Sequence, residues 1–291
     1  MSIPAVLRAL RSVLPVLLVP ALAGAQPGWH SDYPRWTGDF AVLSANALFG
    51  GVSAGLVQTA RGGSFRDGFT RGAAGGVGVY AGKRIAAAQW SGAGFVGRQV
   101  ASVGSSVGWN AGAGRPAFEQ VALPLGLVRF YLRTSGEGPR LQARVDALAV
   151  AATAYAATRP ELEWDAGRSL SAGVMVFRAP EHRLRVAGHD VGGVTYPGTV
   201  VLDTSDELDT SRSRGTVTHE RVHVAQIDQV FLSVGRPVQE AVSSRVPALR
   251  RLSRWVDVDF GTVGFAGTAA MLGTPVLTQP WELEARYLTG N

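Results

Sequence analysis

The chain has 291 residues, of which 46% are hydrophobic and only 17% charged, and its formal net charge is +6. A chain of this length and composition can bury a full core, which excludes intrinsic disorder as a description of the whole protein. The sequence contains no cysteine, which excludes disulfides, thiolate metal sites and cysteine nucleophiles. Any metal site must therefore use histidine and carboxylate ligands.

Residues 1–25 are typical of a secretory signal peptide. Arg8 and Arg11 precede a short uncharged run, and the tripeptide Ala-Gly-Ala at 23–25 is a small-x-small cleavage pattern. A membrane anchor is the alternative, but the run is short for one and contains two prolines. We expect cleavage before Gln26, which lowers the net charge from +6 to +4 by removing two arginines. The expected location is the periplasm, the cell envelope or the medium.

Residues 26–115 form a Gly/Ala-rich region that we expect to be helical. Three blocks of mainly small residues lie within it, at 41–60, 64–89 and 92–112. Small residues at helical spacing, such as Gly104 and Gly108, let helix backbones approach closely, as in membrane helix pairs. The uncharged block Phe40–Ala60 is long enough to cross a bilayer, although it is only weakly apolar. Membrane-associated helices, a tightly packed helical subdomain and Gly-rich strands are the alternatives.

Residues 116–291 are expected to form a second domain with a small β-sheet. Strands are expected where β-branched and aromatic residues gather between turn residues, at 121–133, 173–178 and 194–203. Residues 136–139 are a predicted turn, and 141–158 fit either a strand or a helix. A polar loop at 205–214 precedes an amphipathic helix at about 215–234, and a short helix at 281–288 ends the chain. The predicted fold class is α+β.

The basic charge of the mature chain predicts contact with an anionic envelope surface. In the segment Arg236–Trp255, apolar residues near one face oppose several arginines, so this segment is a candidate for lying on a membrane surface. The alternative is core packing with a solvated basic face. Aromatic residues are sparse among the arginines, so we expect no nucleic-acid partner.

The predicted helix at 215–234 contains an HExxH motif, His219-Glu220-Arg221-Val222-His223. Residues four apart share one face of a helix, so His219 and His223 can both present a ring nitrogen to one zinc ion. Glu220, beside the first histidine, can reach a water at that metal and act as a general base. The motif therefore predicts a zinc site.

The third ligand of the predicted site must be a carboxylate. A catalytic zinc ion takes three protein ligands, and no histidine follows His223 in the sequence. Glu282 and Glu284 in the terminal helix are the candidates. Because they are two residues apart on a helix, they point in different directions, and we expect only one of them to bind the metal.

With these residues the sequence resembles the gluzincin metallopeptidases, in which HExxH on one helix is completed by a glutamate from a later helix. The terminal segment Glu282–Arg286 (ELEAR) is similar to the E-x-x-A-D signature of the prenyl-protein endopeptidase and heat-shock membrane protease group. The resemblance covers the HExxH helix, the preceding strand and the terminal helix, under a third of the chain. Two positions depart from the pattern, because Arg286 replaces an acidic residue and Arg221 an uncharged one.

This resemblance implies a zincin-like fold with His219, His223 and Glu282 as zinc ligands, Glu284 as the second choice and Glu220 as the general base. It implies a zinc metalloendopeptidase that hydrolyses a peptide or protein substrate without a covalent intermediate. The strand at 194–203 is a candidate edge strand for holding an extended substrate. The alternative is a non-catalytic envelope or membrane-associated structural protein whose metal site is a relic or purely structural.

Further side chains are weaker candidates for supporting roles. The oxyanion of the reaction could be stabilised by any of three residues, His189, Tyr196 and Tyr287. Asp228, on the HExxH helix, is a candidate for orienting a ligand histidine. None of these roles is required by the spacing in the sequence.

Overall fold

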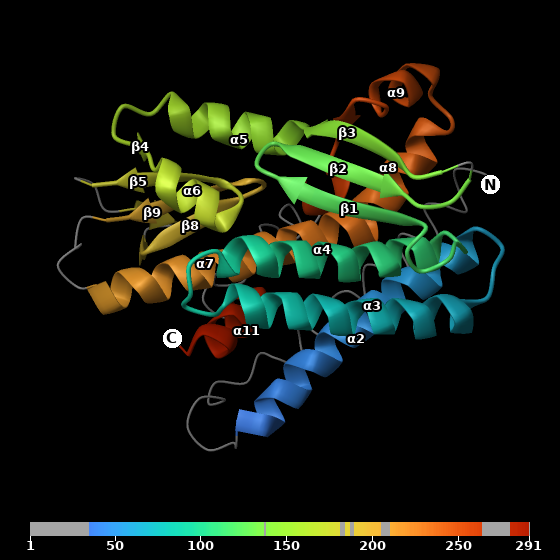
Figure 1. The fold of residues 1–291 in the computed structure, drawn as a ribbon, viewed down its shortest axis with the longest axis horizontal. Helices are drawn as coiled ribbons and strands as arrows, with labels where there is room; N and C mark the ends of the chain where they lie inside the picture. Colours follow the sequence, from blue (N-terminus) through green and yellow to red (C-terminus); the bar gives the residue numbers. More distant parts are fainter. Residues whose placement is uncertain are drawn as a thin grey trace.

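The computed structural model describes residues 35–136, 138–180, 184–186, 189–204, 210–263 and 280–290. Its fold is α+β, as predicted, with more helix than strand (Figure 1). The expected signal peptide at 1–25 lies outside the described residues, as do residues 205–209 of the expected polar loop.

The helices are α2 (Arg35–Ala60), α3 (Phe65–Ala86), α4 (Ala93–Gly112), α5 (Ala147–Ala157), α6 (Ala166–Ala172), α7 (Thr210–Val230), α8 (Arg236–Ser243), α9 (Pro247–Leu252) and α11 (Pro280–Thr289). A π-helical turn, Phe231–Gly235, joins α7 to α8 without a break. The strands are β1 (Gln120–Leu125), β2 (Val128–Arg133), β3 (Arg140–Asp146), β4 (Glu163–Trp164), β5 (Met175–Ala179), β6 (Leu184–Val186), β7 (His189–Val191), β8 (Gly193–Tyr196), β9 (Thr199–Asp203) and β10 (Val256–Asp257).

The described strands form two mixed four-stranded sheets and a separate β6-β7 hairpin. The first sheet has the order β1-β2-β3-β10, with β10 parallel to β3 and the other pairs antiparallel. The second has the order β4-β5-β9-β8, in which β5 and β9 are parallel. Strand β8 therefore lies at an edge of the second sheet, and α5 leads from the first sheet to the second (Figure 1).

The Gly/Ala-rich region forms three packed helices, α2, α3 and α4, which confirms the predicted helical character. Glycine is required where their backbones meet: a Cβ added to Gly75 of α3 would lie 2.6 Å from the carbonyl oxygen of Gly104 in α4. A Cβ added to Gly50 of α2 would lie 2.5 Å from the carbonyl oxygen of Gly72 in α3. Any larger residue at these positions forces the helices apart, so the unusual glycine content serves helix packing.

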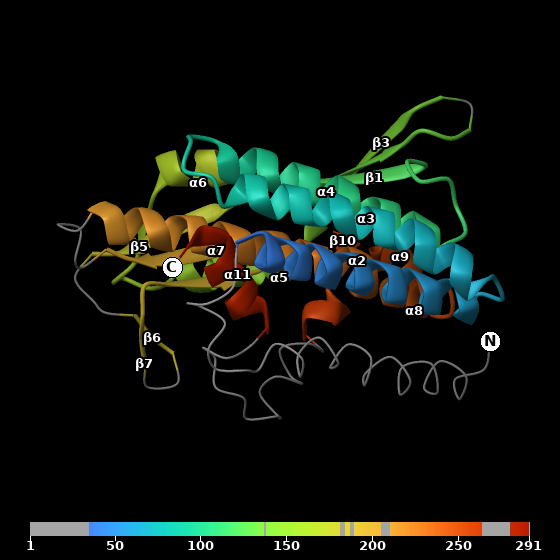
Figure 2. The ribbon, with the colours of Figure 1, turned by 90° about the horizontal axis from the view of Figure 1, so that it is seen from below.

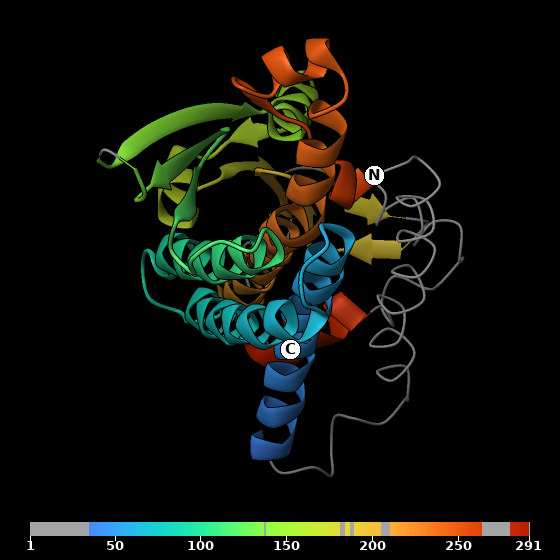
Figure 3. The same cartoon turned by 90° about the vertical axis from the view of Figure 1, so that its right-hand side faces the viewer.

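Helix α2 contains the segment with the composition of a membrane span. Within Gly38–Ala60 the most apolar window has a mean hydropathy of 1.7, and a third of that window is buried. A helix of a folded core can have the same length and composition. Helix α2 packs against α3 and α4, and its first turns project from the rest of the molecule (Figure 3). Contact of this helix with a membrane stays a prediction.

Helix α7 lies between the glycine-rich helices and the second sheet (Figure 2). On one side Ala225 packs against Val79 of α3 and Ala101 of α4. On the other side Val224 belongs to the apolar core beneath β9, together with Val200. Helix α11 packs against α7 as well. The HExxH helix is therefore held by four separate parts of the fold.

Several element boundaries differ from the predictions because of turns that hydrophobic patterning does not reveal. The segments 121–133 and 194–203 each form a hairpin rather than one strand, since Gly126 (φ 56°) and Gly198 (φ 63°) take the left-handed conformation of a tight turn. The segment 141–158 is both strand and helix. Helix α7 begins at Thr210, so the predicted loop at 205–214 was wrong for its last residues.

Candidate metal centre

Three side chains, two from α7 and one from α11, converge at one point. The Nε2 atoms of His219 and His223 are 3.0 Å apart. The Glu282 carboxylate lies 3.2 Å from His219 Nε2 through Oε1 and 3.1 Å from His223 Nε2 through Oε2. All three side chains are partly buried, and one ligand atom from each lies within 4.8 Å of the others. The cluster has the size and donor set to hold one metal ion.

The hydrogen bonds of Gln226 fix the orientation of the His223 ring. The Gln226 side-chain amide donates to the Trp281 carbonyl at 2.9 Å and to the Glu284 carboxylate at 2.7 Å. Both partners only accept, so the Gln226 oxygen must face His223 Nδ1, at 2.7 Å, and accept its proton. In neutral His223 the Nε2 atom then carries a lone pair directed at His219 and Glu282, as metal ligation requires.

Glu284 lies in a separate cluster and does not join the two histidines. Its carboxylate accepts hydrogen bonds from Lys83 at 2.8 and 3.0 Å, from Asn46 at 2.6 Å and from Gln226. Lys83 is fully buried, and its positive charge holds the pKa of Glu284 below the usual value although burial opposes this. With every oxygen engaged, Glu284 is a partner of the histidine-bearing helix rather than a member of the convergent group.

Glu220 is buried beside the cluster and is held by the edge strand β8. Thr195 of β8 donates its hydroxyl to Glu220 Oε2 at 2.6 Å. A Cβ added to Gly193, also in β8, would lie 2.8 Å from the Glu220 side chain, so only glycine leaves room for it. The negative charge of Glu220 is close enough to raise the pKa of His223. The edge strand and this carboxylate are thus in direct contact.

The two arginines that depart from the family pattern take different positions. Arg221 points away from the cluster, because it donates to Ser171 at 3.1 Å and its stem packs on Gly94. Arg286 instead donates its Nε to Glu282 Oε1 at 3.1 Å. The positive charge of Arg286 therefore reaches the carboxylate of the cluster, whereas that of Arg221 does not.

The protonation equilibria of the cluster reflect the close approach of its groups. Burial by itself raises the pKa of Glu282, but hydrogen bonds from His219 and His223 outweigh this and hold the pKa well below its usual value. Burial lowers the pKa of His223, but the carboxylates of Glu282 and Glu220 outweigh it and raise the pKa. In the absence of metal the group therefore favours a bound proton, and a divalent cation would replace that proton.

Asp228 does not orient a ligand histidine, so that expectation was wrong. It lies on the same helix but faces α4 and β2, where it accepts from Arg98 at 2.6 Å and from Arg129 at 3.0 Å. Both guanidinium groups hold the pKa of Asp228 below its usual value despite burial. Arg129 is paired in turn with Asp146 at 2.9 Å. Asp228 therefore anchors the C-terminal half of α7 through buried ion pairs.

Two of the three candidates for oxyanion stabilisation, Tyr196 and Tyr287, make their described contacts away from the cluster. Tyr287 packs against α2, with its ring and hydroxyl next to Gly38. Burial, and next the charge of the nearby Asp39, raise the pKa of the Tyr287 hydroxyl. Tyr196 lies at the exposed end of β8, and His189 lies in β7. No oxyanion donor is assigned from these residues.

Comparison with known proteins gave no match: no protein-family model, no curated protein and no solved structure is similar to this chain. The case for a function therefore rests on the geometry of the described residues.

Sequence reasoning missed the residues that surround the cluster. Gln226 carries a weak signal, because it lies three residues after His223 and so on the same face of α7. Asn46 carries none, since it lies 238 positions from Glu284 along the chain, and Lys83 does not reveal which residue it pairs with, since Glu284 is 201 positions away. The presence of the only lysine in the sequence within a tract of small residues is a signal that a buried charge needs a partner there.

Proposed function

We propose that this protein is an exported zinc-dependent metalloendopeptidase with a zincin-like fold. One observation carries the proposal: the two histidines of HExxH and a single carboxylate from a distant helix converge, with their lone pairs directed at one point. His219, His223 and Glu282 are the proposed ligands and Glu220 the proposed general base. Export, by the expected signal peptide, leaves the envelope or the medium as the place where a peptide substrate is met.

The donor set suits zinc. Zinc bonds of about 2.0–2.1 Å in a tetrahedral arrangement place neighbouring ligand atoms about 3.3 Å apart. Here the two ring nitrogens are 3.0 Å apart, and one oxygen of Glu282 lies 3.2 Å from His219 Nε2 while the other lies 3.1 Å from His223 Nε2. Two imidazoles and one carboxylate also form the ligand set of several catalytic zinc sites, in which a fourth position is left for water or substrate. Both spacing and chemistry therefore support a catalytic rather than a closed structural site.

A zinc ion bound there would act as a Lewis acid and lower the pKa of water to about 7. The residues of the chain supply the remaining functions. Glu220 accepts a proton from the attacking water and returns it to the leaving amine. Thr195 fixes the orientation of that carboxylate through the 2.6 Å hydrogen bond. Among the described strands β8 pairs only with β9, so its other side offers backbone donors and acceptors to an extended peptide next to Glu220.

The test is the substitution Glu220→Gln in the mature chain. The variant keeps the size of the side chain but cannot accept the proton, so hydrolysis of a peptide library falls by at least about a hundredfold. Zinc content stays at one ion per chain, because Glu220 is not a proposed ligand. Glu119→Gln, a change of the same chemistry at the start of the first sheet, serves as the control and leaves the rate unchanged. Equal peptide cleavage by the wild type and Glu220→Gln contradicts the proposal.

A second candidate function is a non-catalytic envelope protein with a structural metal site. The contact between Arg286 and Glu282 favours it, since a guanidinium on a ligand carboxylate withdraws charge from the metal. Measurements of zinc binding, peptide hydrolysis and thermal stability distinguish the two proposed functions. The non-catalytic protein binds zinc through the same residues, shows no peptide hydrolysis at any zinc concentration, and loses thermal stability when zinc is removed.

A further inference from the structure

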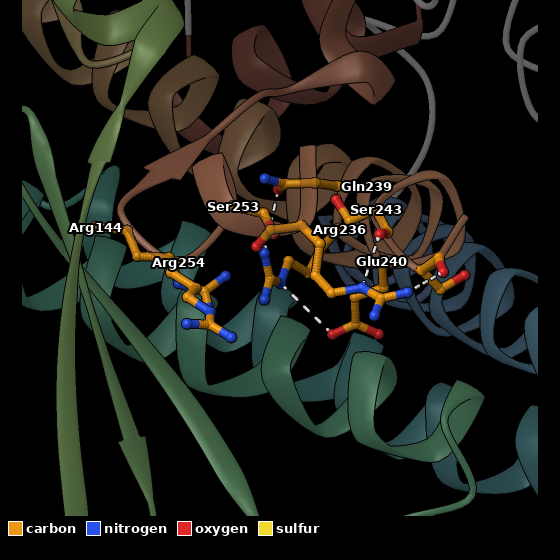
Figure 4. A pocket seen from close by; sticks show the side chains of 9 residues that line it. Arg144, Arg236, Gln239, Glu240, Ser243, Ser253 and Arg254 are labelled. Carbon is orange, nitrogen blue, oxygen red and sulfur yellow. Dashed lines mark hydrogen bonds and ion pairs between the residues drawn. The ribbon is translucent and has the colours of Figure 1, made fainter. Parts of the chain in front are cut away.

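A pocket of about 290 Å³ lies between strand β3 and helices α8 and α9. This part of the molecule is at the opposite end from the start of α7 (Figures 1 and 2). Four arginines and one carboxylate line the pocket with polar neighbours: Arg144, Arg236, Arg250, Arg254, Glu240, Gln239, Ser243, Ser244 and Ser253. In the view of Figure 4, Arg144 and Arg254 occupy one end and Glu240 the other. The pocket is lined almost entirely by donors of hydrogen bonds to an anion.

The positive charges of the pocket exceed the negative charges that face them. Within the described part of the chain, Arg254 makes no ion pair, and the Arg250 guanidinium contacts only the carbonyl oxygens of Ser243 and Ser244, at 3.5 and 2.5 Å. Glu240, the one acidic residue in the lining, is not free to balance them, because Arg61 and Arg115 also bind it, at 2.9 and 3.4 Å. An excess of guanidinium charge is therefore left at the pocket wall.

Two of the arginines are buried with too few hydrogen-bond acceptors. Arg144 and Arg236 are more than nine-tenths buried and share the carboxylate of Asp257, at 3.5 and 3.2 Å, while Glu240 lies 3.6 Å from Arg236 Nε, beyond hydrogen-bond distance. The Nε atoms of both arginines have no hydrogen-bond partner among the described residues. Burial and the charge of Arg236 lower the pKa of Arg144. An anion in the pocket would offset this repulsion between like charges.

We propose that this pocket binds a phosphate group. Guanidinium groups bind phosphate oxygens in pairs of parallel hydrogen bonds, and a doubly charged oxyanion balances the excess charge better than a single carboxylate does. The exposed apolar side chains Val246, Leu252 and Trp255 lie on the same segment as Arg250 and Arg254. A phosphate carried by an anionic lipid would place those side chains against the acyl region, so a lipid headgroup is the expected source and free phosphate the other one.

The test uses the full mature chain and compares two arginines of the same segment. Arg254→Gln removes a guanidinium that lines the pocket. Arg251→Gln makes the same change at an exposed residue of α9 that does not line it. Inorganic phosphate is titrated by calorimetry, and binding to phosphatidylcholine vesicles with and without phosphatidylglycerol is measured by co-sedimentation. Circular dichroism checks that both variants fold.

A phosphate site predicts that Arg254→Gln weakens binding by at least about tenfold, while Arg251→Gln weakens it by less than about twofold. Binding that requires phosphatidylglycerol identifies a lipid headgroup, and binding of inorganic phosphate without vesicles identifies free phosphate. Both results support the site. Equal losses for the two variants indicate diffuse attraction and overturn it, as does the absence of binding to either probe by the wild type.

Discussion

Helix α7 carries two charged clusters that are built in opposite ways. In the C-terminal half, Asp228 faces Arg98 and Arg129, so each charge is matched by an opposite charge at hydrogen-bond distance. Near the middle of the helix, His219 and His223 point nitrogen atoms at each other and at the Glu282 carboxylate, so three groups that can each bind a proton or a cation face one another.

This difference distinguishes a structural cluster from a candidate binding site. Opposite charges at hydrogen-bond distance balance one another, whereas ring nitrogens and a carboxylate that converge need a cation or a proton to hold them together. Both clusters are buried or nearly so, which means that burial alone does not identify the site. The match between donors and acceptors does.

The largest effect is expected from breaking the matched cluster. Asp228→Asn leaves Arg98 and Arg129 without a full counter-charge, so the free energy of unfolding falls by about 3–5 kcal/mol. Urea denaturation measures the change. The amount of zinc bound per folded chain should not change, because His219, His223 and Glu282 are untouched. A loss below about 1 kcal/mol shows that the cluster does not anchor the helix.

The next effect comes from breaking the convergent cluster. Glu282→Gln removes a charged ligand of the zinc ion. Loss of a residue that only supports a ligand costs about 10- to 100-fold in metal affinity, so loss of the ligand itself should lower zinc affinity by more than about a hundredfold. Competition with a chromophoric chelator measures the affinity. Glu284→Gln, two residues away, is the matched control and causes a smaller loss. The opposite order would make Glu284 the ligand.

A pH experiment tests Asp259, a buried carboxyl group near Arg129 that has a raised pKa. Burial raises the pKa of Asp259 to about 6, against hydrogen bonds from Thr262. A raised pKa means that this group stabilises the fold below about pH 4 and that the contribution is lost as the pH rises through about 6. Between pH 4 and pH 7, the free energy of unfolding of the wild type should fall by about 2–3 kcal/mol more than that of Asp259→Asn. Parallel curves for the two proteins contradict this assignment.

The smallest effect concerns the residue that orients His223. Gln226→Met removes the acceptor at His223 Nδ1 and lowers zinc affinity by about 10- to 100-fold. Gln229→Met, at another buried glutamine of α7 that makes no hydrogen bond to His219 or His223, controls for the loss of an amide. The same competition assay measures both variants. Equal affinities assign Gln226 to packing alone.

The sequence allowed the helical glycine-rich region, the HExxH helix and the terminal helix to be predicted, because each has a local pattern. The two-residue turns that contain Gly126 and Gly198 were missed, since one glycine in a run of β-branched residues does not change the hydrophobic period. The choice between Glu282 and Glu284 stayed open for a different reason. It depends on Lys83 and Asn46, whose contacts with Glu284 are set by the packing of distant helices.

X-ray absorption at the zinc edge tests the central claim most directly. The mature protein is loaded with one equivalent of zinc, dialysed, and measured alongside Glu282→Gln. The account predicts one tightly held zinc per chain with two imidazole nitrogens and carboxylate oxygen at about 2.0–2.2 Å, and loss of the oxygen contribution or of the metal in the variant. Protein that retains no stoichiometric zinc, or a spectrum without imidazole scattering, would contradict it.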